Sequence, residues 1–244
     1  MTRPKDCEQF YRARDQRTAT YVGAPWTPRK IVRVVIDSST ARTPPGQHLL
    51  LALTNLLARV HRKIIFTVPS RIPVRVPALV EADSLDRAVV RLAEAIDPCG
   101  SFELGDRGGE IMLGIGDGEP GLAWYLSADR AVGVIAAAPA PVEAGQASTA
   151  IGAGVAACLG GAAAAFKMEM NLPVAARRLS GWNWREGADA EFGPDDIVSF
   201  DVGRVLMVGA GAVAAAVTYW VWSWGGGGEW TVVDRDVVKL HNTN

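Results

Sequence analysis

The chain alternates short apolar runs with longer segments in which apolar residues recur every three or four positions. Short runs rich in β-branched residues are typical of buried strands, and the longer period is typical of helices with one buried face. Strands are predicted over residues 31–37, 63–69, 110–118, 123–129 and 131–139, and helices over residues 46–62, 85–96 and 148–168.

The end of the chain repeats this alternation once more. Residues 203–244 have the pattern of a strand, a turn, a helix and a second strand, which is also the order in which residues 31–170 begin. Regular alternation of strands and helices predicts an α/β fold with mostly parallel, Rossmann-like sheets. We therefore expect tandem units: an N-terminal arm (1–30), a first Rossmann-like domain (31–180), a linker (181–202) and the start of a second domain (203–244).

A glycine pair marks the turn of the second unit. Gly209 and Gly211 stand between an apolar strand and an apolar helix. The first glycine permits a tight turn, and the second lets the backbone approach a phosphate at the helix N-terminus, where free N–H groups and a positive dipole end face the anion. Ala214 takes the third small position, which needs only to allow close packing of the helix on the strand. The pattern predicts a phosphate-binding turn.

An acidic residue follows the next predicted strand. Asp234 comes twenty residues after Ala214, where a carboxylate would accept hydrogen bonds from the ribose of a nucleotide. Strand, turn, helix, strand and acid in this order and spacing indicate nucleotide binding. The alternative is a Rossmann unit that has lost its ligand and keeps its glycines for packing.

The residues after Asp234 separate two kinds of nucleotide. In the run DRDVVKLHN, Asp236 lies two residues after Asp234, and Asn242 lies six residues further on. A nicotinamide cofactor needs neither the second acid nor this asparagine. The run resembles the D-x-D-x-V-x-x-x-N pattern of the ThiF/MoeB-like adenylyltransferases, the family that includes ubiquitin-activating enzymes, with Val237 or Val238 in the valine position.

This resemblance implies ligands and a reaction. In that family the first aspartate binds the ribose of ATP and the asparagine lies by the phosphates, so Asp234, Asp236 and Asn242 would join the glycine turn in holding ATP with Mg²⁺. The family adenylates the C-terminal carboxylate of a ubiquitin-like protein or a peptide. Its arginine, lysine and second aspartate would follow Asn244, so we expect this chain to be part of a longer protein and inactive alone.

The same resemblance implies paired subunits. Bacterial members form pairs, in which an N-terminal arginine reaches the ATP phosphates of the partner, so a homodimer or pseudo-dimer is expected. Arg12 and Arg14 are the candidates for that role, and a solvated basic arm is the simpler explanation of both. No other catalytic residue is identified.

The first domain lacks the features of the second. Its small-residue helix at 148–168, which ends in Phe166 and Lys167, resembles a helix of the same family more faintly. The turn before its first helix has no glycine pair, and Pro44 and Pro45 lack the N–H groups that a phosphate needs. The first domain is therefore expected to be a degenerate, non-binding copy placed before an intact one.

Composition limits which partners and which cellular compartment the sequence predicts. Lys and Arg number 25 and Asp and Glu 26, a net charge of −1, so nothing favours nucleic acid or an anionic membrane as partner. The three cysteines are odd in number and widely spaced, which predicts neither disulfides nor a zinc site and places the protein in the cytoplasm. The apolar stretch 151–166 is shorter than the roughly 20 residues of a membrane span, and the stretch 205–224 is broken by two glycines.

Two other functions stay open. The first is an NAD(P)-dependent oxidoreductase, because Asp234 would also suit the ribose of NAD. The second is a pseudo-enzyme scaffold that only binds partners.

Near the end of the chain, the glycines at 225–228 are expected to form a flexible link between the last helix and the last strand.

Overall fold

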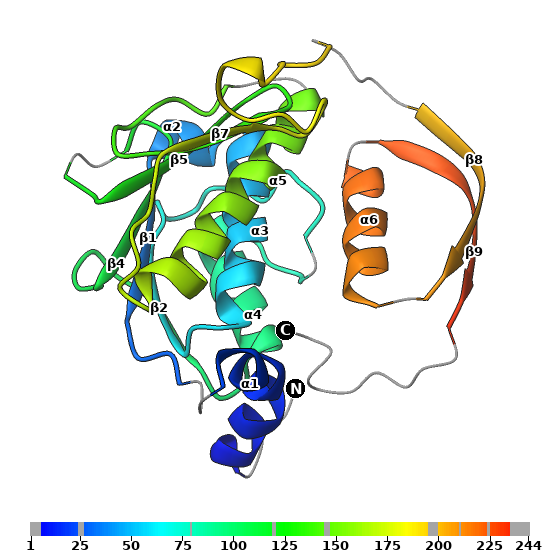
Figure 1. The fold of residues 1–244 in the computed structure, drawn as a ribbon. Helices are drawn as coiled ribbons and strands as arrows, with labels where there is room; N and C mark the ends of the chain where they lie inside the picture. The colour runs from blue at the N-terminus through cyan, green and yellow to red at the C-terminus, as the bar shows by residue number, and fades with distance from the viewer. Residues whose placement is uncertain are drawn as a thin grey trace. The chain divides into compact units, whose positions relative to one another are not determined.

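The computed structural model describes residues 6–23, 27–78, 80–118, 121–143, 147–194, 200–209, 211–223 and 225–234. The chain divides into two compact units (Figure 1). The first unit comprises Met1–Arg3 and Pro28–Asp195, and the second comprises Pro4–Thr27 and Asp196–Asn244. The domain boundaries predicted from the sequence stay predictions.

A seven-stranded sheet forms the centre of the first unit, in the order β3-β2-β1-β4-β5-β6-β7. The strands from β3 to β5 pair in parallel, whereas β6 and β7 pair antiparallel. The predicted α/β class with mostly parallel strands is confirmed, and the antiparallel edge is new. The strands are β1 (Val32–Ile36), β2 (Lys63–Thr67), β3 (Ser101–Leu104), β4 (Ile111–Ile115), β5 (Trp124–Asp129), β6 (Val132–Ala136) and β7 (Arg177–Ser180).

The sequence pattern missed the two edge strands, β3 and β7. Each has four residues, and three of the four in β3 are exposed, so neither shows the apolar run that marked the other strands. β1 is the opposite case, because all five of its residues are buried between strands on both sides. A parallel strand in the middle of a sheet is buried on both faces and is nearly all apolar; in β1 the exception is Arg33.

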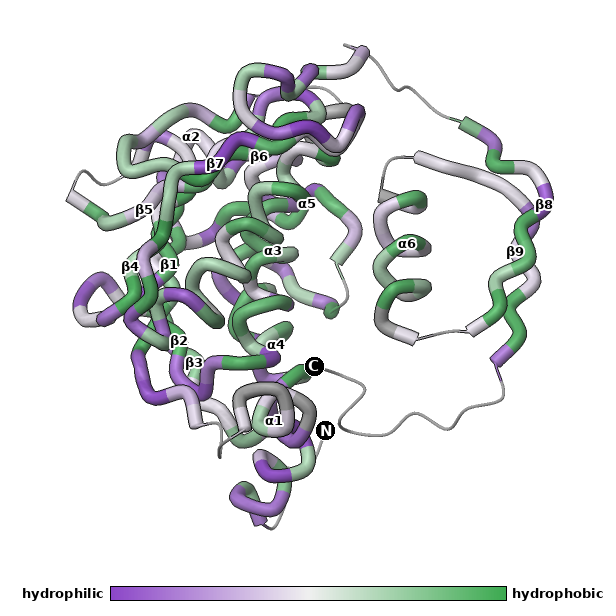
Figure 2. Tube along the Cα trace, in the orientation of Figure 1, coloured by the Kyte–Doolittle hydropathy of each residue, from purple (hydrophilic) through white to green (hydrophobic). Residues whose placement is uncertain are grey.

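Three helices pack on the same side of this sheet, α3 (Pro44–Ala58), α4 (Leu85–Ile96) and α5 (Ala147–Ala162) (Figure 1). The short α2 (Ser38–Ala41) precedes α3. Pro44 and Pro45 begin α3 instead of preceding it, because a missing N–H costs nothing in the first helical turn. The Thr43 hydroxyl accepts a hydrogen bond from the Gly46 amide at 3.1 Å and caps this helix. Figure 2 shows apolar residues concentrated along the inner strands and on α3 and α5.

The small residues of α5 let the helix touch the sheet backbone. A Cβ atom on Gly133 of β6 would lie 2.3 Å from the Ala156 nitrogen, and a Cβ on Gly152 of α5 would lie 2.4 Å from the Arg130 carbonyl oxygen. Larger side chains would separate these elements. The helix continues through a π-helical segment, η1 (Ala163–Met168), so the apolar stretch is longer than predicted. By length and composition Ala150–Met168 could cross a membrane, but 53% of it is buried inside the fold.

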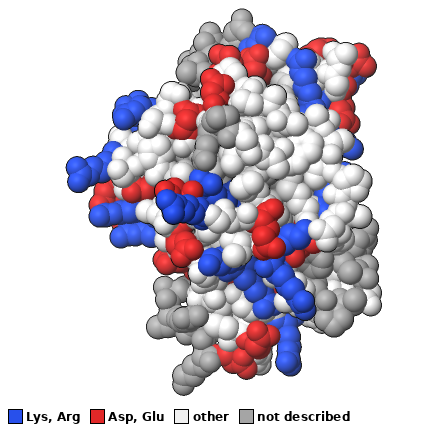
Figure 3. Space-filling model, turned by 90° about the vertical axis from the view of Figure 1, so that its left-hand side faces the viewer, with Lys and Arg blue, Asp and Glu red and all other residues white. Residues whose placement is uncertain are grey.

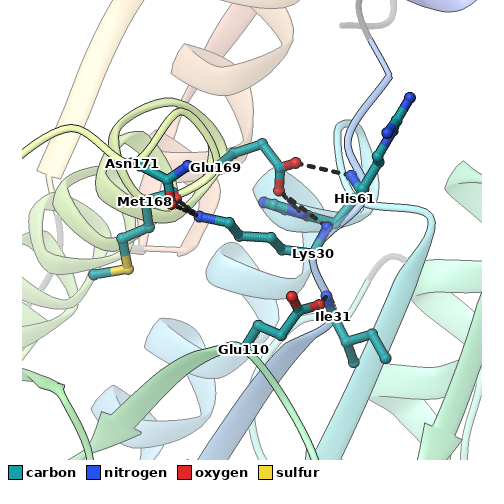
Figure 4. A network of polar contacts seen from close by, with 8 residues as sticks. Lys30, Ile31, His61, Glu110, Met168, Glu169 and Asn171 are labelled. Atoms are coloured by element: carbon teal, nitrogen blue, oxygen red, sulfur yellow. Dashed lines mark hydrogen bonds and ion pairs between the residues drawn. The ribbon is translucent and has the colours of Figure 1, made fainter.

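A polar network fastens the start of β1 to the end of η1 (Figure 4). The Glu169 carboxylate accepts hydrogen bonds from the Arg29 amide at 2.8 Å and the Lys30 amide at 3.3 Å. The Lys30 ammonium donates to the Met168 carbonyl and, at 2.6 Å, to Asn171 Oδ1. The ammonium is thus a second donor to the Met168 carbonyl, which also accepts from the Asn171 amide at 3.2 Å.

The second unit contains one helix from the N-terminal arm and a strand–helix–strand element. The elements are α1 (Cys7–Val22), β8 (Phe200–Val208), α6 (Ala212–Ser223) and β9 (Gly226–Val233). β8 and β9 pair in parallel as a two-stranded sheet. The strand, turn, helix and strand predicted for this part are therefore present in the predicted order.

One expectation from the sequence needs correction. Gly226 to Gly228 belong to β9 and are not a flexible link, because a Cβ on Gly226 would lie 2.6 Å from Val221 Cγ1 and could not fit under α6. Cys158 in α5 keeps a free thiol. The remaining short element, η2 (Gly187–Asp189), is a 3₁₀ helix.

Candidate nucleotide site

The turn between β8 and α6 is open on the side where a ligand would approach. Gly209 has a φ of +91°, which is the left-handed region that glycine adopts without steric cost. A Cβ atom on Gly209 or on Gly211 would meet no other described residue within 4 Å. The glycines are therefore not kept for packing against the rest of the described chain. They leave the backbone bare next to the N-terminus of a 12-residue helix.

Asp234 lies beside this turn. Val208 and Val233 are the last paired residues of β8 and β9, and the Gly209 amide donates to the Val233 carbonyl at 2.7 Å. Gly209 and Asp234 therefore both follow the same register pair, at the carboxyl edge of the two strands. The Asp234 side chain is exposed. Ligands of open parallel sheets bind at this edge, so the glycine turn and the acid are placed to act on one ligand.

α6 packs on the strands through small and medium side chains. Ala214 is half-buried in the first turns of α6, and its role as the third small position stays a prediction. The Thr218 hydroxyl donates to the Ala214 carbonyl of the same helix at 3.0 Å and lies 3.9 Å from the Met207 sulfur of β8. The second contact joins α6 to β8. The remaining residues predicted for the site, Asp236 and Asn242, lie outside the described residues.

In the first unit, the turn between β1 and α2 is filled by a carboxylate of the chain itself. Asp37 Oδ1 accepts hydrogen bonds from the Ser39 amide at 2.8 Å and the Thr40 amide at 2.9 Å. It also accepts one from the Ser39 hydroxyl, and Oδ2 accepts one from the Thr40 hydroxyl at 2.6 Å. These amides are the donors that a bound phosphate would use. Asp37 takes the place of such an anion.

The hydrogen bonds also set the charge of this carboxylate. Burial alone would raise the pKa of Asp37, but the hydrogen bonds from Ser39 and Thr40 outweigh it and lower the pKa below its usual value. Asp37 is therefore held as an anion at neutral pH. The sequence pattern did not reveal this role, although an Asp directly before Ser-Ser-Thr is a common signal of a helix N-cap.

Neighbouring residues close the same turn from the sheet side. A Cβ on Gly116, which follows β4, would lie 2.3 Å from the Thr40 hydroxyl oxygen and 2.8 Å from Asp37 Oδ2. The backbone of the Gly116–Asp117 turn therefore packs directly on the Asp37 carboxylate that caps α2. Gly116 and Asp117 form a turn after β4. The first turn has neither a glycine pair nor free space, in contrast to the β8–α6 turn.

The two arginines of the arm differ in their contacts. Arg14 is paired with Asp15, with 2.7 Å between Nε and Oδ1, and its guanidinium lies 4.8 Å from the centre of the Tyr11 ring. Arg12 is exposed. A role for either arginine at a partner's nucleotide stays a prediction. Among the residues that the structure describes, no three His, Cys, Asp or Glu side chains come together as a metal site.

Comparison with known proteins assigns a family. The family described as the BilD N-terminal domain matches residues 31–184. This chain belongs to that family. No curated protein matches the chain.

The chain is also distantly similar to solved structures of MccB from E. coli. A crystal structure of MccB with MccA has 14% identity to this chain and a TM-score of 0.46. The match covers 64% of this chain and 62% of the MccB chain. A crystal structure of MccB with ATP has 13% identity and a TM-score of 0.42, with the same coverage. The chain therefore spans under two thirds of the length of MccB.

Proposed function

We propose that the β8–α6–β9 element binds ATP and that the protein containing it adenylates a C-terminal carboxylate. The observation that carries the proposal is the open turn: bare backbone at Gly209 and Gly211, a helix N-terminus behind it, and Asp234 beyond the same register pair. The helix N-terminus would receive the phosphates, and Asp234 would accept hydrogen bonds from the ribose. The run from Asp234 to Asn242 supports ATP over NAD through its resemblance to ThiF/MoeB-like adenylyltransferases.

In the proposed reaction, a carboxylate oxygen of the acyl partner attacks the α-phosphorus of ATP. The new bond joins that oxygen to the phosphorus, while the bond between the α-phosphorus and the bridging oxygen breaks and pyrophosphate leaves. Donors at the α6 N-terminus would stabilise the charge that develops on the phosphates. Mg²⁺ would reach the site with the nucleotide and neutralise the same oxygens. The acyl partner is a ubiquitin-like protein or a peptide with a free C-terminus.

We further propose a cytoplasmic protein that forms a homodimer or a pseudo-dimer, in which the first unit is the non-binding half. The filled β1–α2 turn supports the last point, because the donors that a phosphate needs are already bonded to Asp37. Arg12 or Arg14 would act on the nucleotide of the other half. Neither nucleic acid nor membrane is a partner in this proposal.

Calorimetric titration of the chain with ATP and with NADH tests the binding step. We expect Asp234→Asn to weaken ATP binding by about tenfold, because the hydrogen bonds of one charged group to the ribose are worth roughly 1.5–3 kcal/mol. Glu229→Gln is the matched control, because Glu229 is an exposed acid of the same strand that pairs with Arg204 at 3.2 Å. Asp37→Asn should also leave ATP binding unchanged.

ATP–pyrophosphate exchange tests the reaction in the longest form of the protein, with the Asp234→Asn variant beside it. Exchange that depends on the acyl partner and is lost in the variant would support adenylation. Binding of NADH together with no exchange would favour the oxidoreductase. Binding of neither nucleotide would favour the scaffold, and either of these results would overturn the proposal.

A further inference from the structure

Positive charge is concentrated in one part of the sequence. Residues 38–80 contain six arginine or lysine residues and no aspartate or glutamate, in a chain whose net charge is −1. Three of the six lie between the end of α3 and the first residue of β2: Arg59, Arg62 and Lys63. The other three, Arg42, Arg71 and Arg75, lie in the connections that leave the carboxyl ends of β1 and β2, and all three are exposed.

One buried side chain brings these connections together. The Gln47 side chain, fully buried in α3, donates from Nε2 to the Ala41 carbonyl and to the Pro73 carbonyl, both at 3.0 Å. Its Oε1 accepts from the Arg75 amide at 2.7 Å. The Ala41 carbonyl, next to Arg42, and the Arg75 amide therefore both bind the side-chain amide of Gln47.

Arg71 is close along the chain to this junction. It lies two residues before Pro73, which limits the distance between their Cα atoms to roughly 7 Å. The segment is held in place, because Ile72 is buried and its carbonyl accepts from the Leu85 amide at 2.8 Å. Arg71 has a φ of +62°, a conformation that glycine would adopt at lower cost. Unfavourable backbone conformations at exposed side chains are concentrated at ligand and partner sites.

The charges of this arginine cluster (Arg42, Arg71 and Arg75) are not compensated within the described residues. None of the three guanidinium groups makes an ion pair or hydrogen bond there. The face shown in Figure 3 carries acidic and basic side chains next to each other. Lys63 and Glu103, for example, approach to 3.6 Å. The three side chains are therefore a local excess of positive charge, because the nearby acid Asp37 is already bonded to Ser39 and Thr40.

We propose that the arginine cluster binds an acidic segment of a partner protein. Guanidinium groups form paired, charge-assisted hydrogen bonds with carboxylates. Nucleic acid is the poorer fit, because three arginines offer few phosphate contacts and residues 38–80 contain one aromatic residue, the buried Phe66, whereas sites for single strands use exposed aromatics for stacking. The proposal does not depend on nucleotide binding by the second unit.

Fluorescence anisotropy of a labelled peptide of eight glutamates tests the proposal on the whole chain. The cluster variant carries Arg42→Gln, Arg71→Gln and Arg75→Gln together. The control variant carries Arg87→Gln, Arg107→Gln and Arg177→Gln, which removes the same charge from three exposed arginines that already lie near acids. We expect the cluster variant to weaken binding at least about tenfold and the control less than about twofold, because arginine–carboxylate bonds are stronger than screened surface attraction.

Equal loss of binding in both triple variants would overturn the proposal, and so would absence of binding by the unaltered chain. Competition separates the sources of negative charge: unlabelled glutamate peptide should displace the probe at lower concentration than inorganic phosphate or single-stranded DNA of equal charge. The opposite order would also overturn the proposal. Arg71→Gly guards against misfolding, because glycine suits the backbone at that position. This single variant should weaken binding about threefold and keep the thermal unfolding midpoint.

Discussion

The β1–α2 turn and the β8–α6 turn occupy the same place in a strand–helix–strand element but differ in what fills them. In the first, the Asp37 carboxylate takes the helix N–H groups, and Gly116 packs against it. In the second, two glycines leave open space, and the acid, Asp234, comes from the neighbouring strand. A helix N-terminus needs an anion or an acceptor. The first unit supplies it from its own chain, whereas in our proposal the phosphates of ATP supply it in the second.

The difference shows that a glycine near such a turn can have two opposite roles. Gly46 and Gly116 are small because other atoms of the fold lie where a side chain would be. Gly209 and Gly211 are small although no described residue lies there. A packing glycine is needed for stability, whereas in our proposal Gly209 and Gly211 are needed for phosphate binding, and Gly209 is also needed for its φ of +91°. Substitutions at the two kinds of position should therefore have different consequences.

The largest effect is expected at Gly46. In Gly46→Ala, the new Cβ would lie 2.2 Å from the Thr40 carbonyl oxygen, so the α2–α3 corner must shift, and we expect the unfolding free energy to fall by about 3 kcal/mol. Gly211→Ala, at an open position, should change it by less than about 0.5 kcal/mol. Urea denaturation followed by circular dichroism measures both. Equal losses would mean that the two turns are packed alike.

Low pH should destabilise the first unit, which contains the packed β1–α2 turn. Burial lowers the pKa of His48 in α3 to about 4 from 6.5, so below pH 6.5 the unfolded state binds the proton more readily than the folded state does. Stability is therefore lost as the pH falls from 6.5 towards 4, by about 3 kcal/mol in total. Urea denaturation at pH 7, 5 and 4 should show this loss, and His48→Gln should lose less. Parallel pH profiles would contradict the assignment.

Removing the Asp37 carboxylate should have a smaller effect on the free energy of unfolding. Asp37→Ala deletes an N-cap and should cost about 1–2 kcal/mol at pH 7, and Asp37→Asn should cost less because asparagine also caps helices. The folded pKa of Asp37 is lowered, so its charge-dependent contribution is present above the ordinary pKa of 3.8 and is lost as the pH falls through the folded value. The difference between the unaltered chain and Asp37→Ala should shrink below pH 3.8. A difference independent of pH would show that the carboxylate is not held as an anion.

The smallest effect is expected for the exposed ion pair across β8 and β9. The side chains of Arg204 and Glu229 are 90% and 71% exposed, and their atoms approach to 3.2 Å. Exposed pairs are worth at most about 1 kcal/mol, so Arg204→Gln should leave the hydrogen-exchange protection of β8 and β9 nearly unchanged. A large loss of protection would mean that this pair, and not the packing of α6, holds the open turn in place.

The sequence was most informative where the signal is local. The inner strands, the helices at 85–96 and 148–168, and the glycine turn with Asp234 follow from residues close to one another in the chain. Two local signals were missed: the pattern placed Pro44 and Pro45 before α3 and did not reveal that Asp37 caps α2. The pattern was least informative where a partner is distant. It also predicted that the glycines of β9 form a link, because the Val221 contact that requires Gly226 arises only once α6 packs on β9.

The sequence by itself determined the order of strands and helices and the presence of a phosphate-type turn, because both depend on spacing along a few consecutive residues. Tertiary structure alone decided the strand order, the antiparallel edge at β6 and β7, and which of the two turns is open. It also joined Ala41, the residue before Arg42, to Arg75 through the Gln47 side chain. These features depend on hydrogen bonds and close contacts between residues far apart in the chain, and no local pattern encodes such pairings.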